Sequence, residues 1–362
     1  MIRKFISYFA IAVISFVSCV KTGGEGALES PLVIDADIAA SASSKAIISG
    51  TAFQEGHTIG LFVYHSETAD VNNPDEMSKF SLYGARYRNI RAAYNTKDAA
   101  NPWRFRFEGA TTLFENIYLL NPTVATFEEG LAVVAYAPWI EGIPSIKEIP
   151  FTLGGKSEEM TDLMWARQNT HDKSVASDAG VNYKIVPDGN AKNVKLTFRH
   201  ALARLDIGFR CKNDGSVITL SSIKLKKKDG SQTPLLVSGT FNAMDGTISN
   251  PANQSSLQYD YTDKSYTFQS TTDYTYVPML ICPQEYKADG DYILEFQFNW
   301  QTVGEDVQTP KYEIKLSDVN GGFKAGEVYT FRFTVDNYIQ FDGVQVSREW
   351  IELDSNKTTL QF

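Results

Sequence analysis

Hydrophobic residues in this chain recur at every second position, and this spacing constrains the fold more than any other feature. In residues 292–300 the even positions hold Tyr, Leu, Phe, Phe and Trp, whereas most odd positions are polar. In residues 328–335 the odd positions, from Tyr329 to Val335, are apolar. Such alternation is typical of a strand that buries one face. Residues 131–137, LAVVAYA, are apolar on both faces, which predicts a central strand.

Turn signals separate these runs, and helical signals are weak. Glycine follows Asp188, Asp214, Asp229, Asp245, Asp289 and Asn320. Such pairs favour tight turns between strands. After the first 20 residues, no segment keeps a helical apolar period for more than about two turns. The sequence therefore predicts an all-β chain of many short strands.

The length and the 43% hydrophobic content are enough for two separate cores. The segment between residues 166 and 193 is polar and rich in turn residues, as expected of a seam between domains. We therefore expect a first β-sandwich domain over residues 31–185 and a second over residues 186–362.

The N-terminus has the features of an export signal. Arg3 and Lys4 precede an apolar run over residues 5–17, which is too short for the ~20 residues of a membrane-spanning helix. The run ends in Phe-Val-Ser-Cys19, which resembles the lipobox of bacterial lipoproteins, where the cysteine is acylated and becomes the mature N-terminus. We expect a signal peptide over residues 1–18, lipidation at Cys19 and a flexible tether over residues 19–30. A plain signal peptide with an incidental cysteine is the alternative.

Charge and motifs exclude several function classes. The formal net charge is −9, and no basic stripe is present that could neutralise phosphates, which argues against a nucleic-acid partner. None of the four histidines has the spacing of a zinc site, and neither a nucleophile elbow nor a phosphate-binding loop occurs. We expect no catalytic, cofactor-binding or metal-binding residues and no enzymatic activity. Cys211 and Cys282 remain after export; they could form a disulfide or be two buried free thiols, and the sequence leaves both open.

The apolar positions change parity within residues 196–207, LTFRHALARLDI. They are even through Leu196, Phe198 and Leu202, and then odd from Ala203 onward. A strand cannot change parity without turning its buried face outward, unless it contains an extra residue. We therefore predict a β-bulge at residues 200–203, with His200 satisfying nearby backbone groups.

These residues also resemble a known family. LTFRHALARLDI, with Phe198 and His200, resembles the Phe-x-His signature of the fimbrillins, the pilus subunits of Bacteroides-type bacteria. FKAGEVYTFRFTVDN, with Gly326 and Tyr329, resembles the family's Gly-x-x-Tyr strand, and Trp350 its closing tryptophan. Further similar segments, in family order, lie at residues 43–66, 131–139, 158–166 and 277–284.

The resemblance implies a cell-surface lipoprotein made of two transthyretin-like, Greek-key β-sandwich domains. It would act as a structural pilus subunit that polymerises by strand exchange, or anchors a polymer, and supports adhesion. Its implied partners are other pilus subunits, the outer membrane through the lipid anchor, and surface ligands on host or bacterial cells. The implied location is the outer membrane, the fimbrium or both. The resemblance does not distinguish a stalk, tip or anchor subunit.

Processing of the N-terminal strand distinguishes stalk subunits in that family, where an arginine-specific protease typically removes it. This sequence has no arginine between Cys19 and Arg86. Cleavage between Lys45 and Ala46 by another protease, or retention of the strand, are the two outcomes that remain. Retention suits an anchor or an accessory subunit, and we expect it.

A second function class rests on a cluster of aromatic residues. The cluster consists of Tyr259, Tyr261, Tyr266, Phe268, Tyr274 and Tyr276. Exposed rings could stack on sugars, which would make the chain a surface glycan-binding lipoprotein. Cross-strand packing explains the same residues and is the preferred interpretation. Exposure of at least three of these rings on one flat patch would favour glycan binding.

Overall fold

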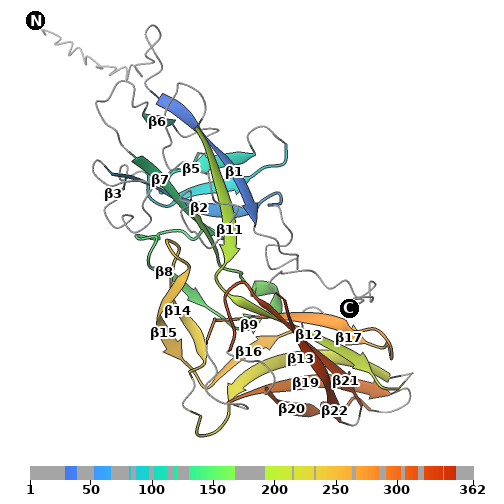
Figure 1. Ribbon diagram of the computed structural model, residues 1–362. Helices are drawn as coiled ribbons and strands as arrows, with labels where there is room; N and C mark the ends of the chain where they lie inside the picture. The colour runs from blue at the N-terminus through green and yellow to red at the C-terminus, as the bar shows by residue number, and fades with distance from the viewer. Residues whose placement is uncertain are drawn as a thin grey trace, which may run out of the picture.

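The computed structural model describes residues 29–38, 53–66, 81–82, 87–97, 102–112, 118–120, 130–167, 192–213, 216–231, 234–262, 266–284, 291–302, 306–316, 322–336 and 338–347 (Figure 1). Within these ranges the regular structure is β, apart from short 3-10 segments such as η3 (Ser157–Glu159). The prediction of an all-β chain is confirmed. The described residues contain no helix that is long and apolar enough to cross a membrane.

The first half of the chain forms one large sheet. In order across the sheet its strands are β5 (Trp103–Arg106), β4 (Ile90–Tyr94), β2 (Thr58–Ser66), β7 (Gly130–Ala137), β10 (Met164–Arg167), β11 (Lys192–His200), β1 (Glu29–Ile38) and β6 (Tyr118–Leu120), with β3 (Ser81–Leu82) beside β2. The pair β1–β11 is parallel, and the other pairs in this sheet are antiparallel. β7 lies inside the sheet, and its residues 133–137 are buried, which confirms the predicted central strand.

This sheet bends around its own core. The ring of Phe53 lies 5.1 Å from the ring of Trp103 on β5 and 5.2 Å from the ring of Phe198 on β11. Four strands separate β5 from β11 in the sheet order. Both strands can contact Phe53 only because the sheet twists and curves. The apolar face that it encloses includes Ile59, Leu61, Val63, Ile90, Ala92, Phe105, Val194 and Leu196.

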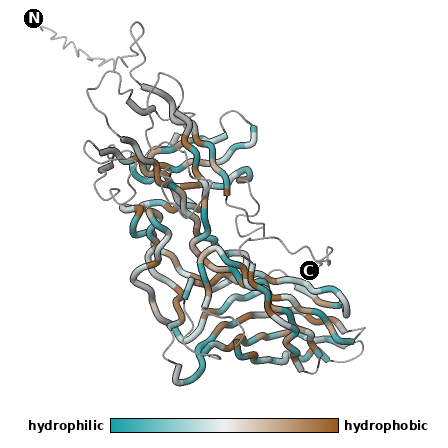
Figure 2. Tube along the Cα trace, viewed as in Figure 1, coloured by the Kyte–Doolittle hydropathy of each residue, from teal (hydrophilic) through white to brown (hydrophobic). Residues whose placement is uncertain are grey.

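The second half is a sandwich of two sheets. One contains β18 (Thr275–Ile281), β12 (Ala203–Cys211), β21 (Val328–Val335) and β22 (Ile339–Ser347). The other contains β20 (Lys311–Leu316), β19 (Tyr292–Thr302), β13 (Ser216–Lys227), β16 (Ser256–Asp260) and β9 (Gly155–Lys156), with β17 (Thr267–Phe268) on β13. Phe209 and Phe333 from the first sheet contact Phe296 from the second at 5.1 and 5.0 Å. Apolar and polar segments alternate along these strands (Figure 2).

A three-stranded sheet lies between the two halves. It consists of β15 (Thr247–Asn253), β14 (Leu236–Asn242) and β8 (Ile149–Thr152). β8 and β9 precede the large sheet's β10 and β11 in sequence but pair with strands of the second half. Trp165 and Tyr136 of the large sheet belong to the same buried cluster as the sandwich core. One face of the large sheet therefore packs into the core of the second half, whereas its other face encloses a separate apolar cluster.

The predicted β-bulge at residues 200–203 is wrong, although the parity change is real. β11 ends at His200 in the large sheet, and β12 begins at Ala203 in the sandwich. Ala201 and Leu202 form the corner, and both are buried. The buried face changes because the chain leaves one sheet and enters another, so no extra residue is needed.

This corner bears on the expected domain division between residues 185 and 186, which itself lies outside the described ranges. β11 follows that division in sequence and yet pairs with β10 and β1 of the large sheet. We therefore propose that the first domain extends to His200.

Candidate functional site

β1 lies between β11 and β6 in the large sheet, and both neighbours come from distant parts of the chain. We call this position the seat of β1. Its residues Leu32 to Ile38 pair in parallel with Lys192 to Phe198 of β11. Its first residues, Glu29 to Pro31, pair with β6. β1 pairs with neither β2 nor β3, the strands that follow it in sequence. Its removal would therefore break no hairpin.

The side chains of β1 divide into a buried and an exposed face. Ile34 and Ile38 are 2% and 3% exposed and belong to the core of the large sheet, with Ala36 packed beside them. Asp35 and Asp37 are exposed, and Lys195 lies 3.7 Å from Asp37. Burying each isoleucine contributes about 1.5–3 kcal/mol, whereas the exposed ion pair contributes little. Apolar burial and the backbone ladder therefore hold β1 in place.

β1 begins inside the stretch predicted to be a tether over residues 19–30. Apolar residues at 32, 34, 36 and 38 are the sequence signal that predicts this strand. Cys19, Lys45, Ala46 and Trp350 lie outside the described residues, so lipidation, cleavage and the match of Trp350 to the family's closing tryptophan stay predictions.

The two fimbrillin-like signatures meet at the corner between β11 and β12. Gly326 donates its backbone N–H to the carbonyl of Leu202 at 2.9 Å, with a φ of 74° that favours glycine. Arg204 donates its backbone N–H to the carbonyl of Glu327 at 3.1 Å. The buried hydroxyl of Tyr329 accepts the N–H of Lys324 at 2.9 Å and lies 3.0 Å from the carbonyl of Gly322, and burial raises its pKa. The loop before β21 is thereby fixed against the corner.

Phe198 and His200 lie on the other side of the same corner. Phe198 is fully buried and contacts Phe53. His200 Nδ1 lies 2.5 Å from Asp162 Oδ2, so a carboxylate is one partner of the imidazole, and the expectation that His200 satisfies nearby backbone groups stays a prediction. The side chains of His200 and Asp162 are both buried at the junction of the sheets. This burial assigns them to the packing of the corner.

The open question about the cysteines is answered by their positions. Cys211 and Cys282 are free and buried, and the thiol of Cys211 donates to the carbonyl of Phe268 at 3.3 Å. Burial raises the pKa of Cys211 to about 11 and that of Cys282 to about 12. Both thiols therefore stay protonated at neutral pH and act as small apolar core residues.

The aromatic cluster does not form an exposed platform. Tyr259, Tyr261 and Phe268 are at most 1% exposed. The hydroxyl groups of Tyr259 and Tyr261 donate to backbone carbonyls of Leu280 and Pro278, across the sandwich. These three rings therefore pack in the core, as preferred from the sequence. The other three, Tyr266, Tyr274 and Tyr276, are half-buried, so no ring of the cluster is fully exposed. Among the described residues, no three His, Cys, Asp or Glu side chains are grouped so that they could hold a metal ion.

Comparisons with known proteins agree with this architecture. A fimbrial protein from Bacteroides vulgatus is similar in structure, with a TM-score of 0.53, 16% identity, and coverage of 88% of this chain and 99% of its own. A candidate cell adhesion protein from Bacteroides ovatus gives a TM-score of 0.52, 18% identity, and coverage of 90% and 99%. At these identities the likeness concerns the fold alone. None of the curated proteins matches the sequence.

The family assignment comes from the sequence profile of one family, described as fimbrillin-like, which matches residues 44–349. The match covers more than half of the chain and includes the corner with its Phe198, His200, Gly326 and Tyr329. The match begins six residues after β1 ends at Ile38, so β1 lies outside the part of the chain that matches the family, which we call the shared body. The chain belongs to the fimbrillin-like family, as its sequence signatures predicted.

Proposed function

We propose that this fimbrial subunit is built for strand exchange at the position of β1. A donor strand of another subunit takes this position when β1 is removed, and a retained β1 keeps it closed, as suits an anchor or accessory subunit. The observation that carries the proposal is the seat of β1, which lies between β11 and β6 and joins no hairpin. The family match from residue 44 onward supports it, because it leaves β1 outside the shared body.

The seat would be a suitable acceptor if β1 were absent. β11 would expose an unpaired row of backbone N–H and C=O groups along Lys192 to Phe198. The sites of Ile34 and Ile38 would become two apolar pockets, placed for side chains four residues apart on one face of an incoming strand. Strand addition of this kind combines a continuous backbone ladder with side-chain specificity.

Location and role follow the same assignment. The fimbrillin-like family consists of proteins of cell-surface fimbriae, which associate with other pilus subunits. We propose in addition that Cys19 carries the lipid that holds the chain on the outer membrane, and that the role is structural rather than enzymatic. A part in adhesion is supported by the description of the Bacteroides ovatus structure as a candidate cell adhesion protein.

The strand-exchange proposal can be tested with two forms of the protein. One begins at residue 20 and keeps β1, and the other begins at Ala46 and lacks it. We expect the first to be monomeric and the second to bind a synthetic peptide of residues 29–38, as measured by fluorescence polarisation. The same peptide with Ile34→Asp and Ile38→Asp is the matched control and should not bind.

A disulfide lock tests the exchange within the intact chain. Asp37 and Thr197 are register partners on the exposed face of β1 and β11, and Asp37→Cys with Thr197→Cys would link them. The locked protein should remain monomeric under oxidising conditions even after cleavage at residue 45, and assemble when reduced. A folded Ala46 form that neither self-associates nor binds the wild-type peptide would contradict strand exchange.

A further inference from the structure

Two arginines face each other on the outer surface of the large sheet. Arg91 of β4 and Arg106 of β5 are direct register partners. Like charges at directly opposite positions of an antiparallel pair destabilise it. Within the described part of the chain, neither guanidinium has a carboxylate partner or a side-chain hydrogen bond. In a chain with nine more acidic than basic residues, this unpaired cationic pair is unexpected.

Both guanidinium groups lie over the ring of Trp139. The guanidinium carbons of Arg91 and Arg106 lie 5.6 and 5.2 Å from the ring centroid. Both arginines and the tryptophan are half-buried. Partial burial and the neighbouring Arg106 lower the pKa of Arg91. Contact with the ring holds the two cations together but provides no hydrogen-bond acceptor for their N–H groups.

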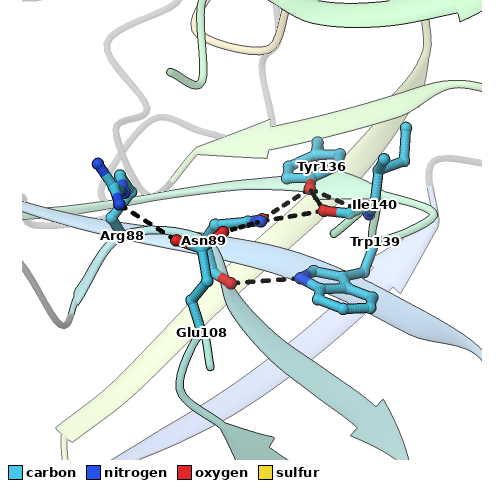
Figure 3. A network of polar contacts seen from close by, with 6 residues as sticks. All are labelled: Arg88, Asn89, Glu108, Tyr136, Trp139 and Ile140. Atoms are coloured by element: carbon cyan, nitrogen blue, oxygen red, sulfur yellow. Dashed lines mark hydrogen bonds and ion pairs between the residues drawn. The ribbon is translucent and has the colours of Figure 1, made fainter. Parts of the chain in front are cut away.

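A buried polar network fixes the position of this tryptophan (Figure 3). Trp139 donates its indole N–H to the carbonyl of Asn89 at 3.2 Å. The Asn89 side chain donates to the carbonyl of Ile140 at 2.9 Å and accepts the Tyr136 hydroxyl at 2.7 Å. Asn89 is fully buried with a φ of 48°, a conformation that non-glycine residues seldom adopt. The ring is therefore held in one orientation before any ligand arrives.

The acidic residue nearest in sequence, Glu108, has other partners. Its carboxylate lies 3.3 Å from Arg88 and 3.5 Å from the side-chain nitrogen of Asn89 (Figure 3). The carboxylate of Glu108, which could have neutralised Arg91 and Arg106, is thus bonded to Arg88 and Asn89 instead. Among the residues that the structure describes, no carboxylate or side-chain acceptor is bonded to the N–H donors of Arg91 and Arg106.

We propose that Arg91, Arg106 and Trp139 form a binding site for a sugar that carries a carboxylate group. Guanidinium groups bind carboxylates through paired N–H donors. The half-exposed indole provides an apolar surface next to this charge, which suits the C–H face of a sugar ring better than it suits a bare inorganic anion. The site lies on the face of the sheet, whereas an added peptide strand would pair with an edge.

The test uses the protein that begins at residue 20, in which β1 is kept, and the probe is sialyllactose. Lactose is the matched probe that lacks the carboxylate. By isothermal titration calorimetry we expect the protein to bind sialyllactose, more weakly at high salt, and not lactose. The double variant Arg91→Gln/Arg106→Gln should weaken binding by at least about tenfold.

Arg199→Gln is the matched control, because Arg199 also stacks on a tryptophan, Trp165, at 5.4 Å but lies away from this site. It should leave binding unchanged. Removing one member of a repelling pair should not lower the melting temperature, so Arg106→Gln alone should melt at or above the wild-type temperature while binding sialyllactose more weakly. This combination distinguishes a ligand site from a purely structural contact.

Three results would overturn the proposal. The first is equal affinity of the wild-type protein for sialyllactose and lactose, and the second is unchanged affinity in a folded double variant. The third is binding of a hexaglutamate peptide that depends on Arg91 and Arg106 while sialyllactose fails to bind, which would assign the site to an acidic peptide. The binding assay does not require the fimbria to assemble, so the result of the assay is independent of strand exchange.

Discussion

The imidazole of His200 and the carboxylate of Asp162 form a buried pair at the point where the chain passes from the large sheet into the sandwich, with Nδ1 and Oδ2 2.5 Å apart. His200 is the last residue of β11, and Asp162 lies just before β10. The neighbouring backbone bond from the Ala201 N–H to the Leu163 carbonyl, 2.8 Å long, ties the same two segments together. This pair therefore joins the segments at the corner.

We predict that the two residues act as one unit. Removing either partner takes a buried hydrogen bond from the other, which typically costs about 1–3 kcal/mol. Asp162→Ala and His200→Ala should each lower the free energy of unfolding by a similar amount, measured by urea denaturation followed by tryptophan fluorescence. The double variant should be little worse than either single variant. Fully additive losses would mean that the two side chains do not interact.

Gly246 provides a test of the contact between the three-stranded sheet and the large sheet. Its φ is 79°, and a Cβ there would overlap the indole nitrogen of Trp165. Gly246→Ala should therefore combine left-handed strain of about 1–2 kcal/mol with overpacking of about 1–3 kcal/mol. The measured quantity is the free energy of unfolding.

Gly230→Ala is the control for this substitution. Gly230 has nearly the same φ, 80°, but no atom lies within 4 Å of the added Cβ position. It should lose only the conformational part. Equal losses at the two glycines would show that the turn after β14 does not press against Trp165.

Several strands could be predicted from sequence because they bury one face. Tyr292, Leu294, Phe296 and Phe298 are fully buried, as the alternation indicates. The strand that the alternation indicates over residues 328–335 is present as Val328–Val335. In these segments the local period alone decides which side chains face the core.

Other features depend on which strands pair, and local patterns do not give that. A change of parity at residues 200–203 is the same in sequence whether a strand bulges or crosses to another sheet. The facing of Arg91 and Arg106 depends on the register of the hairpin between β4 and β5. Placing Arg91 opposite Arg106 requires the turn to be located first, and the intervening NTKDAANP allows more than one register.

The two buried thiols predict a specific chemical and pH behaviour. In a protein without Cys19, native Cys211 and Cys282 should resist a thiol reagent near pH 8, and both should react once the chain is unfolded in urea. Their ordinary pKa is 9.0, and burial raises it to about 11 and about 12. The folded state thus holds these protons more tightly than the unfolded state.

The thiol contribution to stability is therefore complete below about pH 9 and declines as the pH rises through 11 to 12. Buried tyrosines such as Tyr64, with a pKa raised to about 12, add a decline in the same direction. Cys211→Ala/Cys282→Ala should show a shallower loss of urea midpoint between about pH 8 and about pH 10 than the wild-type protein. Rapid labelling of the native thiols would contradict the burial that underlies this prediction.

The processing of the N-terminus decides whether β1 remains in its seat, and the sequence and the sheet suggest the same outcome. No arginine occurs between Cys19 and Arg86, so an arginine-specific protease has no site between β1 and β2. Retained β1 keeps Ile34 and Ile38 in the core and closes the edge of β11.

We therefore predict that the mature chain begins with an acylated Cys19 and behaves as an anchor or accessory subunit, which mass spectrometry of protein from the outer membrane would detect. Cys19→Ala should abolish the lipid and release the protein from the membrane fraction, whereas Cys211→Ala, a change at a buried thiol, should not. A mature chain that begins at Ala46 would instead mean that β1 has been removed. Its seat would then be open to a donor strand, as a stalk subunit requires.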